Sequence, residues 1–324
     1  MVPVCDDAFV HVYFLDAPNS VQVCLTMTML DLQRLRTLRE FALRGTVTEV
    51  ADVLGYSASA VSQQLAALER EAGVPLTRRS GRRLLLTPAG QQLADAAGSI
   101  LGLVEEAETG LRSGRHTPAG TVRLAVFQSA ALALLPTALP LLTSTAPRVR
   151  VEVTQSEPAQ ALEDTWSRDF DLVVAEEYPH HSAPHYEGLT RVTLIRDHIA
   201  LATPAGAAPS ISGHRDGAWV MEPRGTASRH FAEQLCRLEG FEPDVRYETA
   251  DLQAHLALVD AGLAVALIPG LMWPSAPDGV SRIELDEPLQ RTIFAAFRDT
   301  SSKDPAIQAT LAALTMAARE VAAR

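Results

Sequence analysis

The chain has 324 residues and a formal net charge of −11 at pH 7, and this length predicts two or three domains. Hydrophobic residues make up 47% of it, which is ordinary for a folded soluble protein. Its three cysteines lie far apart without a C-x-x-C pair, which indicates neither a disulfide framework nor a zinc site. The longest apolar region is interrupted by Gln128, Pro136 and Pro140, and residues 1–29 lack the basic residues of a signal peptide. We therefore expect a cytoplasmic protein with no membrane partner.

The charge is distributed unevenly along the chain. Residues 31–90 contain nine Arg and six acidic residues, a net charge of +3, so the rest of the chain carries −14. A mildly basic head on an acidic body is compatible with a DNA-binding regulator, because only the head meets the phosphates.

The first segment of the head predicts two short helices. Apolar residues follow helical spacing from Leu32 and stop near Gly45. Thr46 then begins a second helix, and Glu49 supplies the partner residue of a capping box. The second helix ends at Gly55, and a third helix begins two residues later, which predicts a helix-turn-helix.

The third helix, which begins at Ser57, has an apolar stripe of Val61, Leu65 and Leu68. Small and polar side chains lie opposite, as expected where a recognition helix enters the major groove. An ordinary solvated face is the alternative. The candidate DNA contacts in this region are Thr46, Ser57, Ser59, Ser62, Gln63 and Gln64.

A basic hairpin follows the third helix. The stretch PLTRRSGRRLLLTPAG turns at Ser80-Gly81, and arginines flank the turn on both sides. Such a wing binds phosphates or enters the minor groove, although a charged hairpin tip is also commonly just solvated. Its candidate DNA contacts are Arg78, Arg82 and Arg83.

These residues together resemble the winged helix-turn-helix of LysR-type transcriptional regulators. The matching parts are TEVADVLGYSASAVSQQLAALEREAGVPL, the paired arginines and LTPAG. The resemblance implies a DNA-binding domain over residues 29–87 with a double-stranded DNA operator as its partner, and it allows RNA polymerase as another. Ala58 stands where many members have Gln, which puts one base contact in doubt. Met29 stands where members usually begin, so residues 1–28 are either an upstream extension or a disordered tail.

A long helix is predicted over residues 88–113, followed by a hinge over 114–120 that contains two Gly and one Pro. Apolar residues recur along the helix at alternating intervals of four and three, which is typical of a coiled-coil seam. A core helix of the same chain is the alternative. By the resemblance, this helix makes a homodimer or homotetramer, and the seam residues are Leu93, Ala97, Ile100, Val104, Ala107 and Leu111.

Alternating strands and helices occupy residues 121–324, which predicts an open, mostly parallel α/β sheet. The pattern and the segment GLAVALIPG are similar to the family's effector-binding region of two Rossmann-like lobes. We expect lobe 1 over about 121–193 plus 291–324, and lobe 2 over about 194–290.

Ligands of open α/β sheets bind beyond the carboxyl ends of the strands. Four Glu (Glu157, Glu176, Glu177 and Glu222) and no Arg or Lys lie at these ends, which predicts an amine-bearing effector, with Ser129 and its helix N-terminus receiving any carboxylate. Alternatively, these Glu are solvated or pair with Arg191, Arg196 or Arg224. The candidate effector contacts are Phe127, Gln128, Ser129, Ser156, Glu157, Glu176, Tyr178, Met221, Glu222 and Thr249.

Enzymatic function is not indicated, because the sequence contains no nucleophile elbow, P-loop, zinc-protease or dinucleotide-binding motif. The His-rich stretch with His180, His181 and His185 leaves a metal sensor as an alternative, although no spacing defines a coordination geometry. No cofactor and no metal site are predicted. The sequence therefore predicts a transcriptional regulator that responds to a small molecule, with an effector-independent repressor or architectural DNA-binding protein as the alternative.

Overall fold

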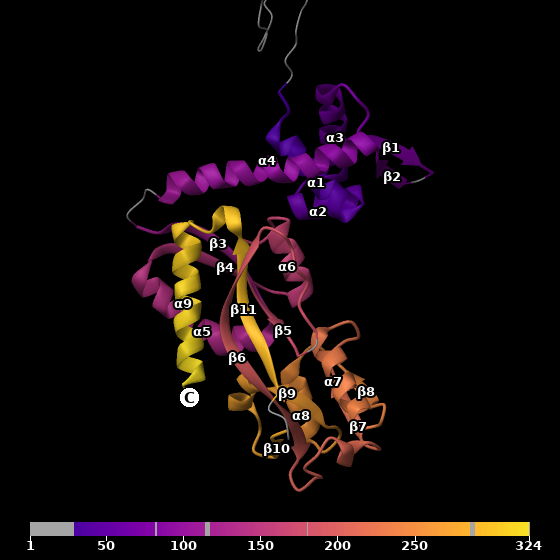
Figure 1. Ribbon diagram of the computed structural model, residues 1–324, viewed down its shortest axis with the longest axis vertical. Coiled ribbons are helices and arrows are strands. Elements are labelled where there is room, and N and C mark those ends of the chain that lie inside the picture. The colour runs from indigo at the N-terminus through magenta and orange to yellow at the C-terminus, as the bar shows by residue number, and fades with distance from the viewer. Residues whose placement is uncertain (1–28, 82, 114–116, 180, 286–288, 324) are drawn as a thin grey trace, which may run out of the picture. The chain divides into compact units, whose positions relative to one another are not determined.

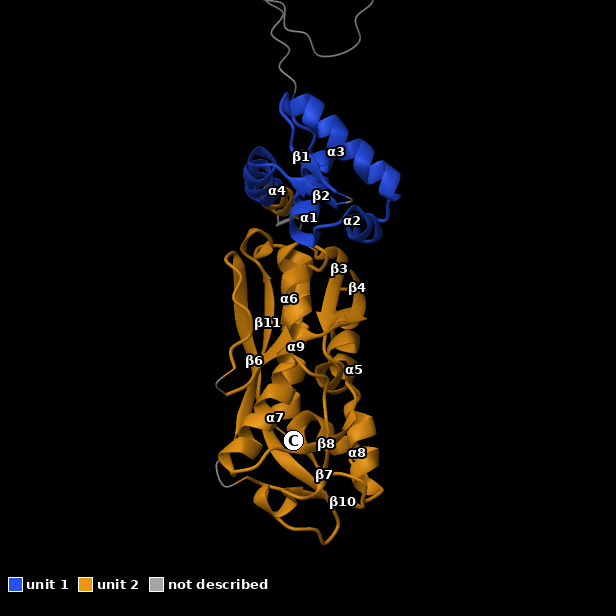
Figure 2. Cartoon of the chain, turned by 90° about the vertical axis from the view of Figure 1, so that its right-hand side faces the viewer, with its two compact units in different colours: residues 1–104 blue, residues 105–324 orange. Residues whose placement is uncertain are grey.

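The computed structural model describes residues 29–324 except 82, 114–116, 180, 286–288 and 324. The chain divides into two compact units, and the division falls between Val104 and Glu105, inside a long helix (Figure 2). The expectation for residues 1–28 and part of the predicted hinge lie outside the described residues, as do Arg82 and His180.

The first unit contains three short helices, a hairpin and the start of the long helix. The side chains of Asp31, Thr46 and Ser57 each accept a hydrogen bond from the first turn of the helix that follows them, which fixes where these helices begin. The elements are α1 (Leu32–Arg44), α2 (Val47–Leu54), α3 (Ala58–Ala72), β1 (Thr77–Ser80), β2 (Arg83–Leu86) and α4 (Pro88–Ser113). The core of this unit is formed mainly by the apolar faces of the three short helices.

The second unit combines a twisted sheet with helices on both of its faces (Figure 1). In chain order, its strands are β3 (Ala119–Val126), β4 (Arg148–Gln155), β5 (Leu172–Glu177), β6 (Leu189–Pro204), β7 (Ala218–Met221), β8 (Asp244–Glu248), β9 (Ala266–Pro269), β10 (Val280–Ile283) and β11 (Gln290–Arg298). Its helices are α5 (Gln128–Thr145), α6 (Pro158–Trp166), α7 (Ala227–Leu238), α8 (Leu252–Asp260) and α9 (Pro305–Ala322), together with the last part of α4.

The strand order in the main sheet is β10-β6-β11-β5-β3-β4, and β9 also pairs with β6. Strands β4, β3 and β5 are parallel, whereas β11 runs antiparallel to β5 and to β6. Because residues 189–203 contain neither Gly nor Pro, β6 continues as one strand of 16 residues. The expected lobe border at 193–194 therefore falls inside β6, whose first part pairs with β11 and whose last part pairs with β9 and β10.

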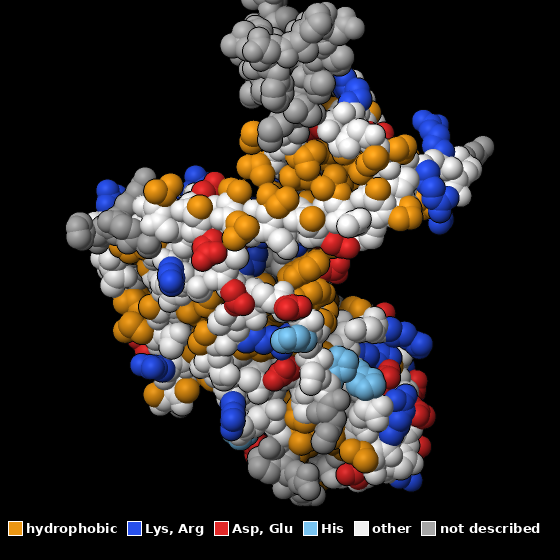
Figure 3. All heavy atoms as spheres, turned by 45° about the horizontal axis from the view of Figure 1, so that its top comes forward, with side chains coloured by type: hydrophobic (Ala, Val, Ile, Leu, Met, Phe, Trp, Pro, Cys, Tyr) orange, Lys and Arg blue, Asp and Glu red, His pale blue; other side chains and the backbone are white. Residues whose placement is uncertain are grey.

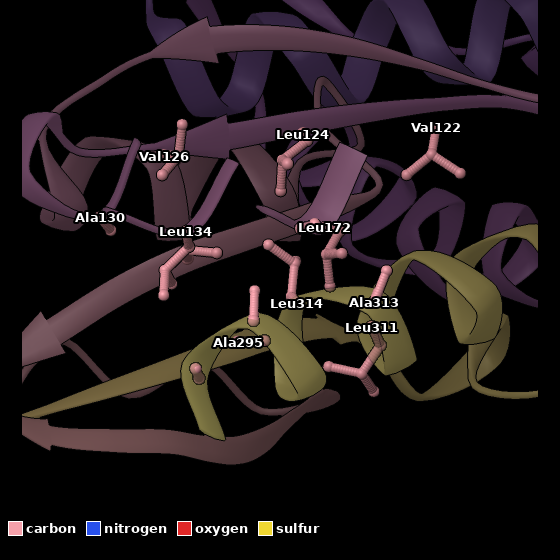
Figure 4. Packing of buried hydrophobic residues seen from close by; sticks show 14 of the residues in the cluster. Val122, Leu124, Val126, Ala130, Leu134, Leu172, Ala295, Leu311, Ala313 and Leu314 are labelled. Atoms are coloured by element: carbon pink, nitrogen blue, oxygen red, sulfur yellow. The ribbon is translucent and has the colours of Figure 1, made fainter. Parts of the chain in front are cut away.

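Alternating side chains of the central strands pack on both faces of the sheet. On one face, Val122, Leu124 and Val126 of β3 point toward Leu134 of α5 and Leu314 of α9 (Figure 4). On the other face, the intervening residues of β3, β5 and β11 contact α6. In the second lobe, α7 and α8 supply most of the helical residues of two further clusters. Among the described residues, no helix is long and apolar enough to cross a membrane.

Candidate functional site

Helix α3 presents a polar surface in the first unit. Val61, Leu65 and Leu68 are buried, whereas Ser59 and Gln63 on the opposite side are exposed. No hydrogen bond within the described chain uses the Gln63 side chain, so both its amide donor and its acceptor are free to meet a base edge.

The other candidates on α2 and α3 already have partners in the chain. Thr46 and Ser57 cap their helices, and the Ser62 hydroxyl donates to the Ala58 carbonyl. Gln64 lies against α1 and not on the exposed face, because its side-chain oxygen accepts a hydrogen bond from the buried Thr37. This contact could not be predicted from helical periodicity. Periodicity places Gln64 beside the apolar stripe of α3, but it does not show that Thr37 of α1 lies opposite.

The hairpin β1–β2 has the predicted form. Ser80 is paired with Arg83, and Gly81 occupies the left-handed region with φ 61°, where a residue without Cβ is unstrained. Arg78, Arg79 and Arg83 are exposed, and their basic side chains gather at the hairpin end of the unit (Figure 3). Such a tip is suited to phosphate contacts.

The predicted seam of α4 is only partly exposed. Ala97 is fully buried in the core of the first unit, and Leu93 and Ile100 pack against the same core. The prediction that these residues face another chain is therefore wrong for Ala97, because its neighbours in its own head already cover it. Large apolar residues of α4 that are exposed lie in the second half of the helix. They include Leu103 and Leu111, which are 67% and 81% exposed, and the smaller Ala107 is exposed as well.

A cavity of about 210 Å³ lies in the second unit at the carboxyl ends of β3, β4 and β5. Seven of the ten predicted effector contacts line it, namely Phe127, Gln128, Ser129, Ser156, Glu157, Glu176 and Glu222. Tyr178 and Met221 line a smaller neighbouring cavity of about 20 Å³, which also shares Glu222 and Leu252 with the larger one. Thr249 lines neither cavity, and its hydroxyl instead accepts a hydrogen bond from the Asp251 amide.

Arg291 is a cavity residue that sequence reasoning missed. Its side chain is 1% exposed, and its guanidinium bonds to Asp197 at 2.8 Å, to Glu176 at 2.5 Å and to the Ser129 hydroxyl at 2.8 Å. Arg291 lies near the amino end of its strand and not at a carboxyl end, and β11 is antiparallel to β5. Its first residues therefore reach the same edge of the sheet as the last residues of β5.

This arrangement corrects one expectation. A cation does lie among the strand ends, and the buried Ser129 hydroxyl accepts a hydrogen bond from it. Of the proposed neutralising arginines, Arg191 pairs with Glu177 at 3.8 Å and not with Glu157 or Glu222. Gln128 is also engaged, since it donates to Asp251 and accepts from the Leu252 amide at the start of α8.

Carboxyl groups outnumber cations among the described cavity residues in spite of Arg291. Burial raises the pKa of Glu157 and that of Glu176, and burial together with these two carboxylates raises the pKa of Glu222 to about 7. Burial alone would lower the pKa of Arg291, but Glu176 and Asp197 raise it, so the guanidinium stays charged. Three carboxyl groups therefore line the cavity beside one cation, which is already paired.

Metal binding finds no support in the described part of the chain. No group of three or more His, Cys, Asp or Glu is placed there to hold a metal ion. The ring of His181 lies 5.2 Å from that of His230, while His180 falls outside the described residues.

Comparison with known proteins identifies both units. Residues 32–91 match the bacterial regulatory helix-turn-helix proteins of the lysR family, and residues 115–319 match the LysR substrate binding domain. The transcriptional dual regulator GltC of Bacillus subtilis is 30% identical over 246 residues, which cover 74% of this chain and 81% of GltC. A probable hydrogen peroxide-inducible genes activator of Streptomyces viridosporus is 30% identical over 252 residues, 74% of this chain and 77% of that protein.

The fold is shared with solved structures. A full-length OxyR variant from Pseudomonas aeruginosa has a TM-score of 0.65 at 18% identity, with 88% of this chain and 95% of that chain covered. The LysR substrate-binding match alone spans more than half of the 324 residues. The chain therefore belongs to the LysR family of transcriptional regulators, with a DNA-binding helix-turn-helix domain and an effector-binding α/β domain.

Proposed function

We propose that the effector of this regulator carries both an ammonium group and a carboxylate, as an amino acid does. The observation that carries the proposal is the excess of carboxyl groups around Arg291. Among the described residues that line the cavity, Arg291 is the cation, and Glu176 with Asp197 already neutralises it. Glu157 and Glu222 therefore face the cavity without a cationic partner, which favours a positively charged ligand.

The carboxylate of such an effector also finds suitable donors. Phe127 and Glu157 precede α5 and α6, and neither residue caps its helix with a side-chain hydrogen bond. Backbone N–H groups in the first turns of both helices, except at Pro158, lie beside the cavity, and helix N-termini favour an anion. A simple dicarboxylate uses these donors but meets the repulsion of Glu157 and Glu222, so a zwitterion fits better.

Isothermal titration calorimetry on the full chain tests this proposal. The amine arm of the panel contains glycine, L-leucine, L-lysine, L-ornithine and putrescine, and the other arm contains acetate, succinate and benzoate. We expect an amino acid to bind, and we expect Glu222→Gln to weaken it while Glu239→Gln, an exposed change at the end of α7, does not. Tight binding of a carboxylate without a cationic group overturns the proposal, and tighter binding of putrescine than of every amino acid overturns its carboxylate half.

For the DNA-binding unit, we propose that Gln63 and the exposed serines of α3 read bases while Arg78, Arg82 and Arg83 contact phosphates. The exposed position of Gln63 supports this assignment. A related structure of similar fold, CbnR, has been solved in complex with its target DNA. In operator titrations, Gln63→Ala is expected to weaken specific binding by about 1–3 kcal/mol and to leave non-specific binding unchanged. Arg83→Ala should weaken binding to every sequence and flatten its salt dependence, whereas an unchanged Gln63→Ala removes Gln63 from base reading.

We further propose that the regulator works as a homodimer or homotetramer on two half-sites, in contact with RNA polymerase. The exposed apolar residues of α4, Leu103, Ala107 and Leu111, support an interchain seam that is shifted along the helix from the one expected. Leu103→Asp should dissociate the assembly in sedimentation experiments, because it buries an unpaired charge, while Leu238→Asp on exposed α7 should not. An intact oligomer in the Leu103 variant places the seam elsewhere.

A further inference from the structure

His255 is a buried histidine with an unused ring nitrogen. It lies on α8, its side chain is 2% exposed, and its Nε2 atom lies 2.8 Å from the Thr249 carbonyl oxygen. Since a carbonyl only accepts, Nε2 carries the proton in this contact and Nδ1 is the acceptor. Among the described atoms, Nδ1 is buried without a hydrogen-bond partner. Such an acceptor calls for a donor, because leaving it unpaired in the protein interior is costly.

A donor can reach Nδ1 through the adjoining cavity. His255 lines the smaller cavity of about 20 Å³ together with Glu222, Tyr178 and the apolar side chains of Met221 and Leu267. Glu222 and Leu252 line the larger cavity as well, so the two spaces adjoin at these residues. The larger space is where we have proposed the effector.

The smaller cavity also contains Arg229, whose charge is balanced locally. Its guanidinium bonds to Glu233 at 2.5 Å and approaches Glu248 at 3.4 Å, and it donates to the Glu222 carbonyl. Burial is the main cause of the high pKa of Glu222 and of the lowered pKa of His255, so the imidazole is neutral. The space thus contains a neutral acceptor beside a carboxyl group, and no free cation of the described chain opposes a ligand ammonium there.

We infer that His255 Nδ1 and the Glu222 carboxyl form a subsite for the terminal ammonium of the effector side chain, so that the effector is an α-amino acid such as L-lysine or L-ornithine. The inference rests on the proposed amino-acid function and names its side chain. Room for about one water molecule accommodates an ammonium nitrogen but not a planar guanidinium or a trimethylammonium group. The apolar side chains around it suit a methylene stem.

The ligand arm of the test uses the unmodified full chain. Calorimetry compares L-lysine and L-ornithine with L-norleucine, L-arginine and Nε-trimethyl-L-lysine. We expect L-lysine or L-ornithine to bind roughly tenfold or more tightly than the other three, because only they bring small N–H donors to both acceptors. Equal binding of L-norleucine overturns the inference and leaves the amino-acid proposal standing. Absence of binding by every amino acid overturns both.

The protein arm uses His255→Leu, with His255→Gln as the variant that keeps a side-chain acceptor. His255→Leu should lose roughly tenfold in affinity for the ammonium side chain and keep its affinity for L-norleucine, while His255→Gln should recover part of the loss. Circular dichroism checks the fold, and a misfolded Leu variant leaves the Gln variant and the ligand arm to decide. If His255→Leu folds and still prefers the ammonium ligand as strongly as the unmodified chain, a single water occupies the space and the inference is wrong.

Discussion

Strand β11 begins beside the effector cavity at Arg291 and ends at Arg298, and both arginines are buried. Arg298 donates to both oxygens of Glu105 on α4 and to the carbonyls of Thr165 and Phe170. Arg291 bonds to two carboxylates and one hydroxyl, but it lines an open cavity where two further glutamates lack a cation. Two buried arginines of the same strand therefore differ in their surroundings: Arg298 is enclosed by its partners, whereas Arg291 borders a cavity.

The difference lies in what the surrounding residues leave unsatisfied. At the Arg298 end, Arg123 pairs with Asp171 and Arg168 lies 3.5 Å from Glu105, so the carboxylates have more than one cation. At the Arg291 end, carboxyl groups outnumber cations and a buried imidazole nitrogen lacks a donor. A cluster in which cations outnumber carboxylates cross-links α4 to the sheet, whereas a cluster in which carboxyl groups outnumber cations beside a cavity marks a ligand site.

The largest effect is expected from Arg291→Met. This change leaves Glu176 and Asp197 without a cation at 9% and 5% exposure, which typically costs about 3–5 kcal/mol. Urea unfolding of the second unit measures the loss. Arg150→Met is the matched control, because the pair of Arg150 with Glu152 is exposed and should contribute less than about 1 kcal/mol. Equal losses in the two variants contradict the role of Arg291.

The second largest effect is expected in the pH dependence of stability, which should differ between the Arg291 end and the Arg298 end of β11. The folded state raises the pKa of Glu222 from 4.5 to about 7, so between these values it holds a proton that the unfolded chain releases. The contribution of Glu222 to stability is therefore full below pH 4.5 and is lost as the pH rises to about 7, by up to about 3 kcal/mol. Glu222→Gln should flatten this decline in unfolding midpoints, and Glu239→Gln should leave it unchanged. If the unfolding midpoint of Glu222→Gln declines with pH as in the unmodified chain, groups other than Glu222 cause the decline.

Arg298→Met should lower the free energy of unfolding by about 2 kcal/mol, which is less than the loss expected for Arg291→Met. The loss is smaller because Arg123 and Arg168 remain beside the two carboxylates, although two backbone carbonyls lose their donor. Calorimetric affinity for the effector should stay unchanged at temperatures where the variant is folded. A larger loss of stability than in Arg291→Met reverses the comparison.

The smallest effect is expected from Glu105→Gln, about 1 kcal/mol at pH 7. Burial alone would raise the pKa of Glu105, but its contacts with Arg298 lower it below the usual 4.5. Its contribution is therefore present above pH 4.5 and lost as the pH falls, the opposite sign to Glu222. Unfolding curves from pH 7 to pH 3 should show less acid destabilisation in Glu105→Gln than in the unmodified chain. The same acid sensitivity in both proteins removes Glu105 from the cluster.

The sequence by itself determined the local elements. The caps Thr46 and Ser57 and the stripe of Val61, Leu65 and Leu68 predicted the helix-turn-helix, because capping and helical periodicity depend on residues a few positions apart. Strand ends likewise identified most of the cavity lining, since parallel strands end at one edge of a sheet.

Only the tertiary structure decided the polarity of the site and the exposed side of α4. Arg291 reaches Ser129, 162 positions earlier in the chain, through an antiparallel strand whose direction no local pattern reveals. The unpaired nitrogen of His255 follows from its own bond to Thr249, and Ala97 is buried because α4 packs on its own head. Periodicity shows which residues share a face, but contacts between distant segments decide what covers that face and which polar atoms remain free.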